Sequence, residues 1–472
     1  VTNALYIGAS NGGVWKSTDS GQTWQVLNDK IAVLGCSDMA IDSANNIMYL
    51  ATGDRSRGGI NAIGTTSYSM GVLKSVADGL TWNPLADTVR WTMLNGDLTQ
   101  AAYLKINALQ LNNANELLIG TTDSPLTAAG NFESGVWKWN PTIKTWQQKQ
   151  GTTLYNQNQQ QTVEDAVVDL SIHPNNIVCV ATQYGYLYRS TDGGNHFTAI
   201  NPPSSPSPPP IPTFLTITNN SPTNIGRVKL ATYKANKNIL YALFVNNVGL
   251  FNKLLKSVDA GLTFKEVNAG TASVTELFFT AGKEHLALTV SPTDANTVYL
   301  GSNNELFKLV VTNNAGNLSA TSTKITKISR PFATLSDTAY VHPDVKDFEW
   351  VGNTLYAATD GGVSSSPDGG ATWSTWYDLT KDLCIAECYR MGAVPNSNNA
   401  FFTGTHDNGI WSYDGANSTA KWLNIEAGDC GEIAVVSADS LYANYFTGHK
   451  IKRGKKTGGY WTFNNAVVPM VA

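Results

Sequence analysis

A short motif that returns along the chain restricts the fold more than any other feature of this sequence. The pattern Ser-x-Asp-x-Gly-x-Thr-Trp first occurs as STDSGQTW, from Ser17. Close copies follow as SVADGLTW at Ser75, STDGGNHF at Ser190, SVDAGLTF at Ser257 and SPDGGATW at Ser366, and GVWKWNPTIKTW from Gly135 is a degenerate copy. The spacing is one or two units of roughly 55 residues, which indicates stacked repeats such as solenoids or propellers.

Each copy of the motif lies among short segments with strand character. Two apolar runs precede it, as ALYIGAS and GVWKS precede the first copy, and most pairs follow a further strand that ends in a Pro/Asn/Asp turn, such as DLSIHPNN. Alternating β-branched and aromatic residues between turn residues are strand signals. Within the motif, Asp can bond nearby amides and Gly tolerates positive φ, as a hairpin turn requires. Four short antiparallel strands per unit predict an all-β fold, the β-propeller.

The number of units follows from the aromatic residues that close them. They are Trp24, Trp82, Trp146, Phe197, Phe264, Trp373, Trp422 and Trp461, with a weak unit ending near Ile328. We therefore expect residues 1–472 to form a single large β-propeller of about nine (eight to ten) four-stranded antiparallel blades. The first unit lacks an opening strand, and the final NNAVVPMVA resembles one. Either this strand closes the ring, which we favour because closure removes a free sheet edge, or the chain is part of a longer protein.

These repeats resemble the Asp-box, or bacterial neuraminidase repeat, of sialidases, sortilin-type receptor domains, two-propeller xyloglucanases and many secreted bacterial propellers. The resemblance extends over essentially the whole chain. Its C-terminal motifs are the most specific: VHPDVKDF, AATDGGVSSSPDGGATW, DLCIAECYRMGAVPNSNNAFFTGTHDNGIW and GDCGEIAVVSADSLYANY. They follow one another as in the sortilin-like repeat proteins that Bacteroidetes export, commonly as type IX secretion cargo. The resemblance implies a secreted or cell-surface propeller.

The composition agrees with an extracellular location. Charged residues make up 14% of the chain, below the ~25% typical of soluble domains. A formal net charge of -4 gives no electrostatic basis for binding nucleic acid or an anionic membrane. No apolar run approaches the ~18 residues of a membrane-spanning helix, so no membrane insertion is expected. Because no signal peptide precedes Val1, we expect a processed or trimmed form.

The cysteines and one Pro-rich stretch carry weaker signals. Five cysteines are too few and too scattered for a disulfide scaffold. Cys179 is expected to be buried in a strand, and a bridge among Cys384, Cys388 and Cys430 is left open. No cofactor is predicted, and a structural cation such as calcium is left open. The stretch NPPSSPSPPPIP has blade-like repeats on both sides, which favours an inter-blade loop over residues 201–226 rather than a domain linker.

The aspartates of the motif are interpreted as structural, because hairpin turns of this kind lie far from a propeller's axis. They are Asp19, Asp78, Asp192, Asp259 and Asp368, with Asp78 displaced by one place within its copy.

Candidate binding residues come instead from strand ends, where loops would converge on the mouth of a propeller. They are His342, Asp344, Asp360, His406, Asp407, Asn408, Asp429 and Glu432, joined by Trp91 and Trp376, which lie outside the motif and could stack on a ligand. Such a set can bind a cation, a sugar or a peptide end, or can simply bond turns and blade edges. After the His-x-Asp pair of His342 and Asp344, the family pattern has a second histidine where this chain has Lys346 and Asp347. This difference weakens the case for a metal site at His342 and Asp344.

The sequence lacks the catalytic residues of most enzyme classes in this family. A sialidase needs an arginine triad and a Phe/Tyr-Arg-Ile-Pro stretch, and no such stretch occurs in this sequence. The resemblance to xyloglucanases places their first catalytic aspartate at Asn11, and an amide cannot act as acid or base. A glycosidase that uses Asp407 and Asp429 is the remaining alternative, because paired carboxylates catalyse glycoside hydrolysis.

The sequence therefore predicts a secreted or surface-displayed, non-catalytic β-propeller. We expect it to recognise a glycan or a protein on its loop face, in adhesion or as a part of a larger surface assembly. A glycoside hydrolase of the xyloglucanase-like type is the alternative.

Overall fold

A computed structural model describes most of the chain. The described residues are 4–31, 34–53, 69–85, 105–122, 135–149, 153–156, 161–164, 167–182, 185–200, 225–268, 282–303, 306–325, 341–374, 383, 385–415, 422–445 and 450–465. Trp91, Trp376, most of the Pro-rich stretch 201–226 and the final strand-like segment 466–472 lie outside them. Every regular element in the described part is a β-strand, so no helix there could cross a membrane.

The chain divides into two compact units, which are described separately. Unit 1 comprises Val1–Ile328, Thr338–Thr359 and Val363–Leu383, and unit 2 comprises Ser329–Asp337, Asp360–Gly362 and Cys384–Ala472.

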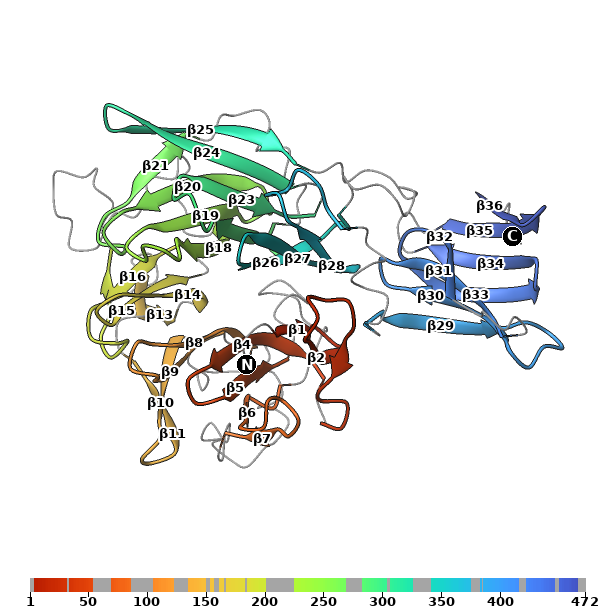
Figure 1. Ribbon diagram of the computed structural model, residues 1–472, viewed down its shortest axis with the longest axis horizontal. Coiled ribbons are helices and arrows are strands. Elements are labelled where there is room, and N and C mark those ends of the chain that lie inside the picture. Colours follow the sequence, from red (N-terminus) through yellow and green to blue (C-terminus); the bar gives the residue numbers. More distant parts are fainter. Residues whose placement is uncertain are drawn as a thin grey trace. The chain divides into compact units, whose positions relative to one another are not determined.

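The described part of unit 1 contains seven blades, and within each blade neighbouring strands follow chain order (Figure 1). The first four are β1 Leu5–Ala9, β2 Gly13–Ser17 and β3 Gln25–Val26; β4 Cys36–Asp42, β5 Ile47–Thr52, β6 Val72–Ser75 and β7 Asn83–Pro84; β8 Lys105–Leu111, β9 Leu117–Thr122, β10 Gly135–Asn140 and β11 Thr145–Gln148; β14 Val167–His173, β15 Ile177–Thr182, β16 Leu187–Ser190 and β17 Thr198–Ala199. A separate hairpin consists of β12 Thr153–Asn156 and β13 Gln161–Glu164.

The other three sheets of unit 1 follow the same pattern. They are β18 Ile225–Thr232, β19 Leu240–Asn246, β20 Phe251–Ser257 and β21 Lys265–Asn268; β22 Ala287–Val290, β23 Thr297–Gly301, β24 Leu306–Asn314 and β25 Asn317–Lys324; β26 Val345–Val351, β27 Thr354–Thr359 and β28 Gly362–Ser366. A parallel pairing of β21 with β25 joins two of these blades at their last strands. The first strands of successive sheets contact one another from β4 to β26, as expected for blades arranged around an axis.

Unit 2 contains two further four-stranded blades. Their strands are β29 Cys388–Ala393, β30 Ala400–Thr405, β31 Gly409–Asp414 and β32 Trp422–Glu426; β33 Cys430–Ser437, β34 Ser440–Tyr445, β35 Lys450–Thr457 and β36 Tyr460–Asn465. With the seven of unit 1 this makes nine blades in the described part of the chain, so the predicted all-β, antiparallel blade architecture is confirmed. That all nine complete one ring stays a prediction, as does closure by the final strand.

The hydrophobic core is divided among the spaces between neighbouring sheets. Strand β19 shows why, because its run LYALFV is apolar on both faces. Leu240, Ala242 and Phe244 belong to the cluster shared with the preceding blade, whereas Tyr241 and Leu243 belong to the cluster shared with the following blade. Alternate side chains of a strand point to opposite faces, so a blade buried on both sides needs a continuous apolar run.

The repeated motif forms the predicted hairpin turn. In the copy at Ser257, the Ser257 hydroxyl accepts the Gly261 amide at 2.9 Å and donates to Asp259 at 2.7 Å. Asp259 also accepts the Thr263 amide at 2.9 Å and the Thr263 hydroxyl at 2.6 Å. The copies around Asp19 and Asp368 repeat these four bonds, and in the copy at Asp192 a histidine replaces the threonine. These bonds explain why Asp, Gly and a hydroxyl residue recur at fixed spacing.

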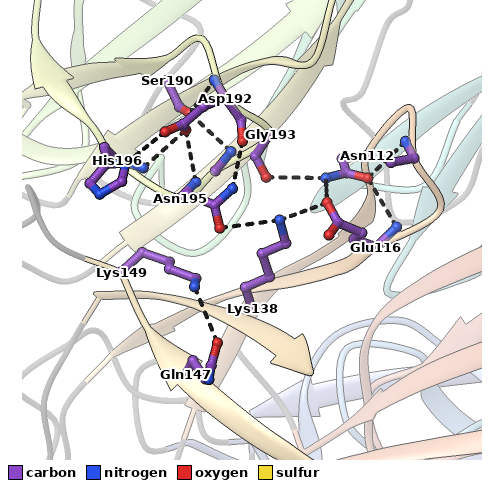
Figure 2. A network of polar contacts seen from close by, with 12 residues as sticks. Asn112, Glu116, Lys138, Gln147, Lys149, Ser190, Asp192, Gly193, Asn195 and His196 are labelled. Carbon is purple, nitrogen blue, oxygen red and sulfur yellow. Dashed lines mark hydrogen bonds and ion pairs between the residues drawn. The ribbon is translucent and has the colours of Figure 1, made fainter. Parts of the chain in front are cut away.

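In the copies at Ser75, Ser190 and Ser257, the turn is also held by the preceding blade. In two copies the acceptor is the carbonyl oxygen of the residue after the motif aspartate. Gly193 accepts a hydrogen bond from Asn112 Nδ2 (3.1 Å), and Ala260 accepts one from Arg189 Nε (2.9 Å). Figure 2 shows the first case, in which Asn112, with Lys138 of the same blade, reaches the turn that contains Asp192. In the copy at Ser75, the displaced Asp78 instead bonds the Tyr6 hydroxyl and the Lys16 amine of the preceding blade. The motif therefore fastens one blade to the next.

Replacing Ser257 by alanine is expected to lower the free energy of unfolding by about 1–3 kcal/mol, because the buried Gly261 amide loses its acceptor. Chemical denaturation measures the loss. The matched variant Thr263→Val removes a solvent-exposed bond to the same carboxylate and should cost less than about 1 kcal/mol. Equal losses in the two variants would contradict the central role of the serine.

The motif aspartates should also make stability depend on pH in acid. Hydrogen bonds from the Thr23 hydroxyl, the Thr23 amide and the Ser17 hydroxyl lower the pKa of Asp19 from 3.8 to about 2. For Asp259, burial raises the pKa, but the bonds from Thr263 and Ser257 outweigh it and lower the pKa. A lowered folded-state pKa means that the unfolded chain takes up protons first.

The stabilisation is therefore present above about pH 4 and lost as the pH falls towards 2. Urea unfolding between pH 4 and 2 should show a flatter profile for Asp19→Asn than for the wild type, and parallel profiles would contradict the assignment.

Candidate functional site

Four of the predicted binding residues come together in unit 2. His406, Asp407 and Asn408 form the turn between β30 and β31, and Asp429 directly precedes β33. One ligand atom each from His406, Asp407 and Asp429 lies within 4.8 Å of the other two. We call these three residues the His406 cluster.

The backbone around the cluster is tightly fixed. Asp407 has φ +54°, and the amide of Asn408 donates to the carbonyl oxygen of His406 at 2.6 Å. The Gly409 amide donates to Gly428 at 2.8 Å, which ties this turn to the segment that leads into β33. Asn408 and Gly428 form a parallel β-bridge. The two loops that supply the cluster are therefore held together by backbone bonds.

The side chain of Asn408 supports the turn from within. Its Nδ2 donates to the carbonyl oxygens of Asp360 and His406, both at 3.0 Å. The backbone carbonyl oxygen of Asn408 accepts Trp411 Nε1 at 2.8 Å. The Nδ2 group of Asn408 thus helps to hold the loop in place.

The histidine lies between carboxylates. His406 Nε2 is 3.4 Å from Asp407 Oδ2, and His406 Nδ1 is 3.9 Å from Glu387 Oε2. The Tyr389 ring meets the imidazole edge-on, with centroids 5.7 Å apart. Both ring nitrogens thus face acidic groups, and the ring plane is set by an aromatic neighbour. The side chains of His406, Glu387 and Asp407 remain about one third exposed, at 34%, 35% and 31%.

Asp429 has the most unusual environment in the cluster. Burial raises its pKa above the ordinary value, and the nearby charge of Asp407 adds to this, while His406 and a backbone bond from Asp407 act in the opposite direction. Its Oδ1 is buried and has no hydrogen-bond partner in the described part of the chain. An acceptor of this kind is costly to bury unless a proton, an ion or a ligand group meets it.

The other predicted residues do not join the cluster. In unit 1, Asp344 Oδ1 lies 3.4 Å from His285 Nε2, and His342 is buried with Nδ1 3.1 Å from the Pro343 oxygen. In unit 2, the exposed Glu432 pairs with Arg390, whose Nε is 3.4 Å away. Trp91 and Trp376 lie outside the described residues. Whether any of the predicted residues binds a ligand stays a prediction.

Sequence reasoning missed Glu387, Tyr389 and His285. Glu387 directly precedes the hairpin β29–β30, in which Cys388 pairs with Thr405. The next pair outward is Glu387 with His406, and the His406 amide donates to the Glu387 carbonyl oxygen at 2.9 Å. Counting back from the turn in VPNSNN would instead have placed His406 opposite Cys388, because the register shifts by one residue between Cys388 and Arg390.

The described cysteines carry no bridge. Among the described residues, Cys36, Cys179, Cys388 and Cys430 form no disulfide with one another, and Cys384 lies outside these residues. Cys179 is buried, as predicted.

Comparisons with known proteins support the fold. No protein-family model matches the sequence, and no curated protein is similar to it. The structure is similar to a GH74 enzyme from Niastella koreensis, with a TM-score of 0.59, 15% identity, and coverage of 100% of this chain and 65% of the enzyme. It is also similar to an ancestral GH74 enzyme, with a TM-score of 0.61, 15% identity, and coverage of 98% of this chain and 60% of the enzyme. This chain thus spans less than two thirds of either enzyme, and it has the fold of a β-propeller protein.

Proposed function

We propose that this protein is a secreted or surface-displayed β-propeller that binds a carbohydrate without cleaving it, at the loops around the His406 cluster. The observation that carries the proposal is the partly exposed group of three carboxylates, in Glu387, Asp407 and Asp429, beside the Tyr389 ring. A few well-placed polar groups with an aromatic neighbour suit a ligand rich in hydroxyl groups. The likeness of the C-terminal motifs to exported repeat proteins supports the extracellular location and a part in adhesion or surface assembly.

Glycoside hydrolysis is the second candidate. It is favoured by the raised pKa of Asp429, because a carboxyl group whose pKa is raised by burial suits the role of general acid in a glycosidase. The GH74 enzymes that the structure resembles lend it weight. Against it, Asp429 is bonded by the backbone of Asp407 itself, whereas the two carboxyl groups of a glycosidase flank the scissile bond from different sides. Asn11 also stands at the position that the xyloglucanase resemblance gives to a catalytic aspartate.

A polysaccharide panel, scored for retention and for new reducing ends, tests the proposal. We expect retention without cleavage. Asp429→Asn should weaken retention about 10–100-fold, since a hydrogen bond to a charged group contributes about 1.5–3 kcal/mol. The matched variant Asp439→Asn alters an exposed carboxylate in the β33–β34 turn and should leave retention unchanged.

Each other outcome has a definite meaning. New reducing ends that disappear in Asp429→Asn would make the protein a hydrolase. Neither retention nor cleavage across the panel would contradict carbohydrate binding and leave a protein partner as the ligand.

A further inference from the structure

We propose that His406, Asp407 and Asp429 together bind one divalent transition-metal ion. The inference is independent of carbohydrate binding, because it concerns the geometry of the three side chains alone. Two ligand atoms held by one tetrahedral ion at about 2.1 Å lie about 3.4 Å apart. His406 Nε2 and Asp407 Oδ2 are separated by 3.4 Å, and all three ligand atoms of the cluster lie within 4.8 Å of one another.

The second nitrogen of His406 is oriented as in a metal-binding histidine. Such a histidine usually directs its other ring N–H towards a carboxylate, which fixes the tautomer and makes the ligating nitrogen more basic. Here Nδ1 faces Glu387 Oε2 at 3.9 Å, so that Nε2, on the side of Asp407, is the nitrogen available to an ion. The contact of the Tyr389 ring limits rotation of the imidazole.

A second, separate observation is the unpartnered oxygen of Asp429. Oδ1 is buried without a hydrogen-bond partner among the described residues, and a carboxylate oxygen of Asp429 lies within 4.8 Å of ligand atoms of His406 and Asp407. Three groups of these types would repel or stay unsatisfied at such distances without a cation or protons between them. The backbone bonds of Asn408 and Gly409 hold the loops in this arrangement, so little reorganisation is needed for an ion to bind.

The donor set selects the type of ion. One imidazole nitrogen with two carboxylate oxygens suits Zn²⁺ or Mn²⁺, whereas Ca²⁺ takes 6–8 oxygen ligands. Three protein ligands leave at least one coordination position for water or an added ligand, as in open metal sites.

Titration calorimetry of the chelator-treated chain with Zn²⁺, and separately with Mn²⁺, tests the proposal with the metal alone as probe. We expect one ion per chain. His406→Ala should weaken binding at least 100-fold, and Glu387→Gln should weaken it by about 10–100-fold, as expected for a residue that orients a ligand. His196→Ala, which removes an exposed histidine of unit 1, and Asp439→Asn should bind as the wild type does.

Three results would overturn the proposal: Zn²⁺ and Mn²⁺ affinities in His406→Ala equal to those of the wild type, no heat of binding in the wild type with either ion, or tighter binding of Ca²⁺ than of both. Asp429→Asn keeps the shape of the side chain and serves as a second variant if His406→Ala misfolds, with circular dichroism as the check. The titration contains no carbohydrate, so a failure to bind the metal does not contradict carbohydrate binding. A failure to retain carbohydrate likewise does not contradict the metal site.

Discussion

Replacing Gly409 by alanine is expected to abolish both metal binding and carbohydrate retention, and to destabilise unit 2 by about 2–4 kcal/mol. Gly409 has φ +77°, a conformation that costs an L-residue about 1–2 kcal/mol. An added Cβ would also lie only 1.9 Å from the Glu426 carbonyl oxygen, a backbone atom. Because a backbone atom cannot rotate away, the turn must shift, and His406 and Asp407 are part of that turn.

A matched glycine separates the clash from the cost of the backbone conformation. Gly458, in the turn between β35 and β36, has φ +61° with no atom within 4 Å of an added Cβ. Gly458→Ala should therefore lose only about 1–2 kcal/mol and keep full Zn²⁺ affinity. Urea denaturation and Zn²⁺ titration of both variants provide the comparison. If Gly409→Ala behaved like Gly458→Ala, the close packing of the two loops would not control the site.

The blades could be predicted because their signals are local. The motif at Ser257 contains its own turn: the serine, the aspartate and the threonine bond one another within a few residues. What holds one blade to the next could not be predicted in the same way. A basic residue recurs at one place in the strand that leads into the motif, as Lys16, Lys138 and Arg189, but its acceptor in the next blade differs each time: the Asp78 carboxylate, the Asn195 side chain and the Ala260 carbonyl oxygen.

The site could be predicted only in part, for the same reason. Polar residues at strand ends predicted His406, Asp407 and Asp429 as binding residues. The same pattern also predicted Glu432, which pairs with Arg390 instead. Which strand ends meet depends on how β33 follows the preceding hairpin, and the bond between Gly409 and Gly428 that fixes this has no signature in the side chains. The division into two units likewise depends on packing between repeats, which the repeat pattern does not record.

Replacing Phe244 by alanine is expected to destabilise unit 1 by about 3–5 kcal/mol, the usual cost of removing a buried aromatic ring. The ring lies fully buried in β19, within the cluster between two blades. Lys253 Nζ lies 5.5 Å from its centroid, and Lys253 is itself buried. Truncation therefore opens a cavity and also removes the aromatic face from a poorly hydrated ammonium group.

A double-mutant cycle divides this loss between packing and charge. Phe244→Leu fills most of the cavity and should cost less than Phe244→Ala. In a Lys253→Met background the ammonium is absent, so Phe244→Ala should cost about 0.5–2 kcal/mol less than in the wild type. Calorimetric unfolding of the four variants measures these differences. An unchanged cost in the Lys253→Met background would assign the whole effect to the cavity, and a cost near zero in either background would contradict the central place of the inter-blade clusters in the stability of unit 1.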